Sequence, residues 1–281
     1  MTDTTRSVAR EPLLLADLSS PETQDLLPRI ELVLIPVGAH EQHGPNIAVS
    51  TDTISADALC RAAAARVGPA VAVAPVVPWG VSWHHLRFAG TISLRQSTLI
   101  AVLEDIVGSL YAHGMRHFLV VKGHGGNNAA ITTAIEQIKH DTGVPLIASV
   151  FGYALIAEQA KMLLPAEAIG HGGGDEAALV MAVEPHRAKP SAFAAPQATG
   201  RQVETAALLR AYGGVLARRY DEVTHNGATG DATSASAEIG QQILDGAAQR
   251  LAEIIEVMLR EADAAEEPEA GVNERGRHMG G

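Results

Sequence analysis

The chain has 281 residues, of which 47% are hydrophobic, and this is enough to form one large α/β domain around a buried core. A formal net charge of −11 argues against nucleic acid as a partner, because phosphates require a basic protein surface. No apolar stretch approaches the roughly 20 residues that cross a bilayer, and the single cysteine excludes an internal disulfide, so we expect a cytoplasmic protein with no membrane partner.

Short β-branched runs alternate with longer helical stretches in the first half of the chain. The predicted strands cover residues 31–37, 70–77, 117–122 and 144–150, and the predicted helices between them cover 53–67, 97–113 and 127–142. The strands are nearly continuous apolar runs, which is typical of parallel strands covered on both faces. Strand–helix–strand units in series predict right-handed crossovers and a doubly wound, mostly parallel sheet.

The second half of the chain has a mainly helical pattern. Helices are predicted at residues 175–183, 200–219 and 236–261, with an Ala- and Pro-rich surface excursion at 185–199. Residues 262–281 mix acids, Gly and Pro without periodicity, so we expect a disordered acidic and Gly-rich tail. No internal repeats are present, and one domain over residues 1–261 is the simplest interpretation.

The segment VGAHEQHGPNIAVSTDT follows the first of these predicted strands and carries Glu41, His43 and Asp52. In open α/β sheets, ligands bind beyond the carboxyl ends of the strands. Glu41 and His43 are two residues apart, so in extended backbone their side chains point to the same side. Two alternatives remain open: Asp52 can cap the following helix, and Glu41 and His43 can be solvated loop residues.

A second predicted strand runs into the glycine-rich turn KGHGGNN and places His124 just past its carboxyl end. The surrounding glycines allow backbone conformations that other residues adopt only with strain. A phosphate-binding loop is the alternative, but the segment matches neither GxGxxG nor the Lys-containing P-loop pattern. Two strand ends therefore offer carboxylates and imidazoles to one crevice.

A third cluster, HGGGDEAALVMA, places His171, Asp175 and Glu176 before an apolar helix. Acids in a first helical turn also favour the helix dipole, so Asp175 can instead be a capping residue. Mixed carboxylate and imidazole ligands suit Zn, Mn or Fe(II). A bridging aspartate would hold two divalent ions about 3.5–4 Å apart, and such a pair lowers the pKa of bound water toward ~7 and polarises a carbonyl oxygen. This chemistry splits C–N bonds.

These residues lie in motifs that resemble those of the creatininase family. The motifs are GAHEQHGPNIAVSTDT, SWHHLRFAGTISL, GHGGN and GATGDATSASAEIG, which follow the family order over residues 34–240. The resemblance implies a three-layer α/β/α sandwich, usually assembled as a hexamer, so we expect a homo-oligomer. By residue-to-residue match it implies these site residues: metal ligands Glu41, His43, Asp52 (the bridge), His124 and Glu176, and His85 near the substrate.

Departures from the family pattern bear on the substrate. A family glutamate in the third cluster is Gly174 here, and a glutamate that binds metal in true creatininases is Gly126 here. The region that corresponds to a substrate-covering tryptophan is glycine. We therefore expect a substrate other than creatinine. The acid that protonates the leaving amine is left open among three catalytic candidates: His171, His85 and Asp175.

The leading hypothesis is a metal-dependent amidohydrolase. It would cleave a C–N bond of a small cyclic or formyl amide with water activated by two divalent ions, Zn, Mn or Fe. One alternative is a peptidase that trims a short peptide during maturation of a redox cofactor. Two further alternatives are a hydrolase of cyclitol rings or ketones and a non-catalytic protein that binds small molecules.

Overall fold

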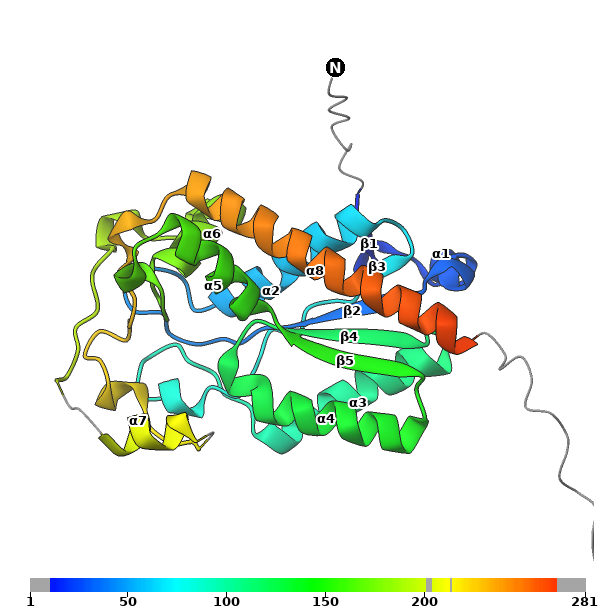
Figure 1. Cartoon of the computed structure of the whole chain (residues 1–281), viewed down its shortest axis with the longest axis horizontal. Coiled ribbons are helices and arrows are strands. Elements are labelled where there is room, and N and C mark those ends of the chain that lie inside the picture. Colours follow the sequence, from blue (N-terminus) through cyan, green and yellow to red (C-terminus); the bar gives the residue numbers. More distant parts are fainter. Residues whose placement is uncertain (1–10, 201–203, 213, 267–281) are drawn as a thin grey trace, which may run out of the picture.

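Five parallel strands form one sheet in the order β1-β3-β2-β4-β5 (Figure 1). The structure, a computed structural model, describes residues 11–200, 204–212 and 214–266. The strands are β1 (Leu13–Leu14), β2 (Leu32–Val37), β3 (Val71–Val73), β4 (His117–Lys122) and β5 (Leu146–Phe151). In the middle of the sheet Ile35 lies opposite Val120, and each neighbouring pair is parallel. The prediction of a mostly parallel sheet is confirmed.

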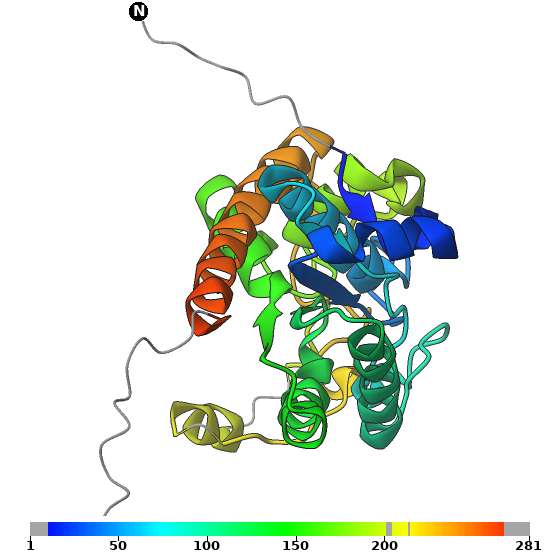
Figure 2. The same cartoon turned by 90° about the vertical axis from the view of Figure 1, so that its right-hand side faces the viewer.

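Helices cover both faces of this sheet, and Figures 1 and 2 show the three layers. One layer contains α2 (Thr51–Val67), α5 (Gly152–Leu163), α6 (Gly174–Val183) and α8 (Ala237–Glu266), and the other contains α3 (Gln96–Ala112) and α4 (Asn128–Thr142). Two shorter helices, α1 (Ser20–Leu26) and α7 (Glu204–Ala211), lie at the periphery. The three-layer α/β/α sandwich implied by the family resemblance is confirmed.

The central strands β2 and β4 are buried along their whole length. Leu32 and Leu34 belong to the core between the sheet and the layer of α2 and α8, whereas Val33 and Ile35 belong to the core on the other face. Successive strand side chains point to opposite faces, and here both faces are covered by helices. This is why the strand is apolar at every position and not only at alternate ones.

Several elements differ from the sequence-based expectation. The strand expected at 70–77 ends at Val73, because Pro75 has no N–H to continue the ladder. The single helix expected at 200–219 is wrong: α7 ends at Ala211, before a double glycine that disfavours helix, and residues 214–219 are irregular. Residues 201–203 and 213 lie outside the described residues. An unexpected helix, α5, follows β5 directly.

At the carboxyl end, α8 continues through Glu266, beyond the expected end at residue 261. Met258 and Ala262 are still buried in its last turns, so packing supports the longer helix. Residues 262–266 are thus helical and not part of a disordered tail. Residues 267–281, the rest of the expected tail, lie outside the described residues.

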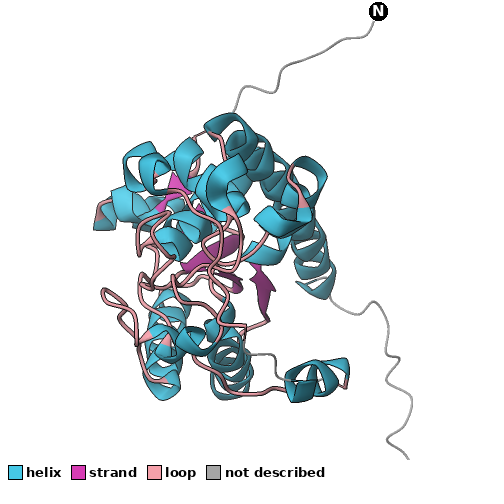
Figure 3. Ribbon diagram, turned by 90° about the vertical axis from the view of Figure 1, so that its left-hand side faces the viewer, coloured by secondary structure: helices cyan, strands magenta, loops and turns pink. Residues whose placement is uncertain are grey.

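Parallel crossovers bring the carboxyl ends of all strands to one end of the sheet. Figure 3 looks at this end, where the loops gather in front of the strands. The loops after β2 and β4 supply three of the candidate site residues, Glu41, His43 and His124. Among the helices of the described residues, none is both long and apolar enough to cross a membrane.

Candidate metal centre

The loop after β2 supplies two deeply buried ligand candidates. Glu41 is 1% exposed and His43 is 0% exposed, so the interpretation as solvated loop residues is wrong. The N–H of Glu41 donates to the carbonyl oxygen of Val49 at 2.9 Å, which fixes the loop. The Nδ1–H of His43 donates to the carbonyl oxygen of Glu41, also at 2.9 Å. The lone pair of His43 Nε2 is therefore free for a cation.

Asp52 lies in the first turn of α2 with one carboxylate oxygen toward each of two imidazoles. Its Oδ1 is 3.4 Å from His43 Nε2, and its Oδ2 is 3.5 Å from His124 Nδ1. The N-cap of α2 is Ser50, and no side chain caps this helix. The capping role considered for Asp52 is therefore not observed. The carboxylate instead spans two clusters of donor atoms.

Glu176 approaches the same centre from the first turn of α6. Its Oε2 is 3.6 Å from His43 Nε2 and accepts a hydrogen bond from the N–H of Gly172 at 2.7 Å. Gly172 has a φ of +66°, a conformation that favours glycine. A Cβ at this glycine would also lie 2.7 Å from the carbonyl oxygen of His43. The glycine-rich segment thus lets α6 come close to the loop after β2.

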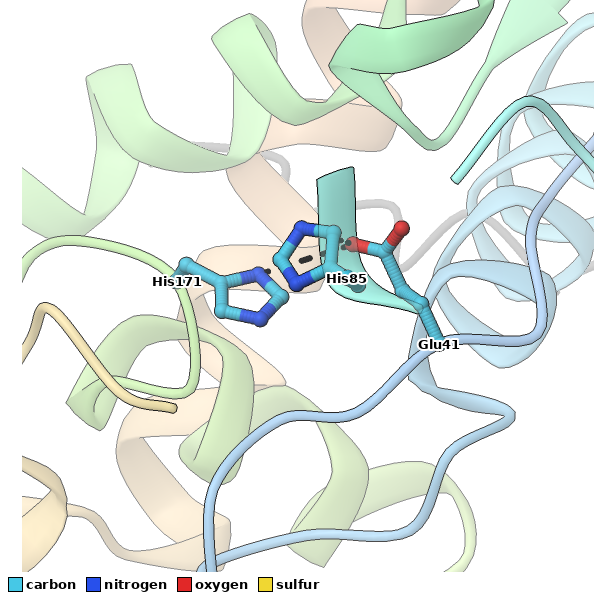
Figure 4. Close-up of side chains that lie close together, drawn as sticks. All are labelled: Glu41, His85 and His171. Carbon is cyan, nitrogen blue, oxygen red and sulfur yellow. Dashed lines mark ion pairs between the residues drawn. The ribbon is translucent and has the colours of Figure 1, made fainter. Parts of the chain in front are cut away.

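The carboxylate of Glu41 lies among three imidazoles. Its Oε2 is 3.1 Å from His124 Nε2. Its Oε1 is 3.3 Å from His85 Nε2 and 3.6 Å from His171 Nδ1. Figure 4 marks these two ion pairs with dashed lines. These residues come from four separate segments, so the fold brings together all five expected ligands and two of the three expected catalytic residues.

The donor atoms of this centre fit a metal ion. Three buried side-chain atoms have no hydrogen-bond partner among the described residues: Glu41 Oε2, His43 Nε2 and Asp52 Oδ2. Buried polar atoms without partners are strongly unfavourable, and all three face the space between the carboxylates and imidazoles. Hard carboxylate oxygens mixed with imidazole nitrogens suit zinc, manganese or iron(II).

The carboxylates make the electrostatic potential at this centre negative. Burial alone would lower the pKa of His43, but the carboxylates of Glu176 and Asp52 raise it to about 10. Burial would also lower the pKa of His124, but the carboxylates of Glu41 and Asp52 raise it to about 9. Burial also raises the pKa of Glu176 to about 8. A cation between these carboxylates would stabilise their charged forms.

Of the candidate catalytic residues, His85 and His171 line the pocket and Asp175 lies behind it. Asp175 is fully buried, and its carboxylate accepts hydrogen bonds from the Tyr153 hydroxyl at 2.8 Å and the Gly170 N–H at 3.2 Å. Its two oxygens are therefore engaged in holding the pocket wall. Burial lowers the pKa of His85 to about 3 and that of His171 well below its ordinary value.

Gln42 fixes the orientation of these two imidazoles. Its Oε1 accepts from the Gly44 N–H at 2.8 Å, so its Nε2 is the donor that lies 2.8 Å from His85 Nδ1. The proton of neutral His85 is therefore on Nε2, toward Glu41. The Nε2–H of His171 donates to the Gln42 carbonyl oxygen at 2.6 Å, which leaves the Nδ1 lone pair toward Glu41.

Several pocket residues were not identified from the sequence. The cavity measures about 360 Å³, and Phe151, Tyr153 and Tyr220 line it together with the histidines. The Tyr220 ring lies 3.9 Å from the ring of His85, centroid to centroid. Tyr220 follows an irregular segment, and no local pattern distinguishes it from a packing residue. Only the tertiary contact identifies it.

A buried cluster of carboxylates and imidazoles at the carboxyl ends of parallel strands is typical of metal-dependent hydrolases. The family model described as "Creatininase: Creatinine amidohydrolase" matches residues 16–255. A mycofactocin precursor peptide peptidase of Mycobacterium ulcerans (strain Agy99) is 30% identical over 247 residues, covering 84% of this chain and 89% of that protein. The chain therefore belongs to the creatininase family, and it is a hydrolase.

Solved structures agree in fold. A putative creatinine amidohydrolase from Bacteroides fragilis has a TM-score of 0.77 at 25% identity, covering 89% of this chain and 98% of that one. A solved structure described as "Creatininase Mn" has a TM-score of 0.75 at 24% identity, covering 89% of this chain and 99% of that one. The likeness extends over nearly all of both folds.

Proposed function

We propose that this hydrolase cleaves an amide C–N bond at a centre of two divalent metal ions. The observation that carries the proposal is the placement of Asp52. Its two oxygens face His43 Nε2 at 3.4 Å and His124 Nδ1 at 3.5 Å, and Oδ2 has no hydrogen-bond partner among the described residues. A carboxylate in this position is suited to hold one ion on each side.

The five ligand residues would divide between the two ions. Glu41 and His124 would hold one ion, His43 and Glu176 would hold the other, and Asp52 would be shared. When bound, such a pair supplies activated water and a polarised carbonyl. The donor set is compatible with zinc or manganese.

The proton transfers belong to the two imidazoles beside Glu41. The Nδ1 lone pair of His171 faces the pocket side of Glu41, so this ring can accept a proton from the attacking water and return it to the leaving amine. His85 presents Nε2–H toward Glu41 and fixes that carboxylate. Asp175 would hold the pocket wall, because its carboxylate accepts hydrogen bonds from the Tyr153 hydroxyl and the Gly170 N–H.

A short peptide is a second substrate class for the same reaction. The observation in its favour is the likeness to the mycobacterial peptidase, which extends over 84% of this chain. A peptide bond is itself an amide C–N bond, so the same two-metal chemistry applies. The 360 Å³ pocket accommodates either a small amide or the end of a peptide.

The experiment that tests the proposed function combines metal analysis with a substrate panel. We expect the full-length chain to bind two zinc or manganese ions after chelation and reconstitution. Asp52→Ala should lose at least one ion, and hydrolysis should fall at least about 100-fold, equivalent to about 2.7 kcal/mol. Asp57→Ala is the matched control, because Asp57 lies on the same helix and its carboxylate pairs with Arg61. Unchanged metal content in Asp52→Ala would refute the two-metal centre.

The substrate panel separates the two substrate classes. Cyclic amides and formyl amides are compared with short peptides of varied carboxyl-terminal residues, and products are identified by mass spectrometry. Release of a terminal amino acid or dipeptide would favour the peptidase. Ring opening or release of formate would favour the small-amide hydrolase. No turnover of any amide by the metal-loaded chain would count against both.

A further inference from the structure

His84 lies at the pocket beside the Glu41–His124 side of the centre. One of its ring nitrogens forms a group with a Glu41 oxygen and a His124 nitrogen, in which all three atoms lie within 4.8 Å of one another. The rings of His84 and His124 are nearly parallel, with an angle of 10° and centroids 5.5 Å apart. Within the part of the chain that the structure describes, the His84 ring has no hydrogen bond or ion pair. Neither nitrogen is engaged by the protein, so the one that carries the lone pair can bind an ion.

The position of His84 depends on the absence of a side chain at Gly126. A Cβ at Gly126 would lie 2.9 Å from His84 Cε1, and it would overlap with His124 Nε2 and the carbonyl oxygen of Val81. Any side chain there would displace one of the two imidazoles. The glycine thus leaves a space beside the centre, and the His84 ring occupies it.

Neighbouring rings hold His84 in this orientation. The Trp83 ring lies edge-on at 5.7 Å, and the rings of His85 and Tyr220 lie at 4.3 Å and 5.8 Å, centroid to centroid. A ring enclosed in this way loses little further freedom when it binds an ion. The short helical turn Trp83–His85 places His84 on the Glu41–His124 side while His85 contacts Glu41 Oε1.

We propose that His84 is a further ligand of the metal ion held by Glu41 and His124. This inference rests on the proposed function, because it requires the metal centre. The ion would then have donors from two carboxylates, Glu41 and Asp52, and two imidazoles, His84 and His124. A second imidazole favours zinc or cobalt over manganese at this side of the centre.

The test measures metal binding directly in the full-length chain. Metal-free protein is titrated with Co²⁺, and the visible d–d absorption and the affinity in competition with a chelator are recorded. We expect two ions for the unmodified chain. In His84→Ala we expect one of the two to bind at least about tenfold more weakly, with an altered spectrum. Addition of imidazole should restore the spectrum. His84→Gln keeps a polar side chain of similar length, so it tests the same point if His84→Ala perturbs folding. We expect the same loss of metal affinity in His84→Gln.

His113→Ala is the matched control, since His113 is exposed and distant from every candidate ligand group. Binding of both cobalt ions by His84→Ala and His84→Gln with unchanged affinity and spectrum would overturn the assignment of His84 and leave the two-metal centre intact. Failure of the unmodified chain to bind cobalt would instead overturn the proposed function and this inference with it. The two failures are distinguishable.

Discussion

Asn127 connects three segments beneath the metal centre. Its Oδ1 accepts from the Val81 N–H at 2.8 Å, and its Nδ2 donates to the Gly38 carbonyl oxygen at 2.9 Å. The side chain is fully buried, so bulk water does not compete for these two hydrogen bonds. Asn127 is the last residue of the GHGGN motif, and it holds the loop after β2 against the loop that carries His84.

We expect Asn127→Ala to destabilise the protein by about 2–5 kcal/mol, because the Val81 N–H and the Gly38 carbonyl group would both be left buried and unpaired. Chemical denaturation measures this free energy of unfolding. The control is Asn128→Ala, since Asn128 is the exposed next residue and its loss should change stability by no more than about 0.5 kcal/mol. Equal effects of the two substitutions would contradict the role of Asn127.

The reactivity of the Cys60 thiol follows from its burial. Cys60 is 0% exposed in α2, and burial raises the pKa of its thiol well above the ordinary value. The reactive thiolate is therefore both scarce and inaccessible in the folded protein. We expect no reaction with a thiol reagent under native conditions at pH 8 and one equivalent per chain in denaturant. Rapid native labelling would show that α2 opens locally.

At the scale of elements, α2 approaches the end of β4 through a glycine. A Cβ at Gly123 would lie 2.5 Å from the carbonyl oxygen of Asp52 and 3.1 Å from the Cβ of Ala56. Both contacts are to the helix that carries Asp52. The backbone of the turn after β4 and the first turn of α2 are thus in direct contact, and this contact sets the distance between Asp52 and His124.

Gly123→Ala should therefore move α2 and destabilise the protein by about 1–3 kcal/mol, with weaker metal binding. Gly108→Ala is the same change in α3, where nothing lies within 4 Å of the added methyl group, and it should stabilise by about 0.5–1 kcal/mol. Thermal unfolding and metal titration of the two variants measure both effects. Stabilisation by Gly123→Ala would mean that the close approach is absent in solution.

At the scale of the whole molecule, the candidate metal centre joins one helical layer to the sheet. Asp52 and Glu176 come from helices of one layer, while Glu41 and His124 come from loops at the ends of β2 and β4. A bound ion would therefore resist separation of these elements. Without metal, the buried atoms Glu41 Oε2, His43 Nε2 and Asp52 Oδ2 have no hydrogen-bond partner among the described residues.

We expect metal removal to lower the melting temperature. Free metal at 100 times its Kd adds about 2.7 kcal/mol to stability, which corresponds to roughly 5 °C for a chain of this size. Differential scanning fluorimetry with and without a chelator measures the difference. In Asp52→Ala the chelator should have a smaller effect, because at least one ion is already lost. A melting temperature that is insensitive to metal in the unmodified chain would argue against a tightly bound pair of ions.

The amino-acid sequence by itself determined the parallel sheet and most of its helices, because apolar runs such as 31–37 and 117–122 reflect burial on both faces. Ordered motifs also indicated the five ligand candidates. Tertiary structure alone decided which atoms face one another: that Asp52 spans two imidazoles, that Asp175 holds the pocket wall, and that Tyr220 and His84 line the pocket. These relations join residues far apart in the chain, and local periodicity carries no information about such distances.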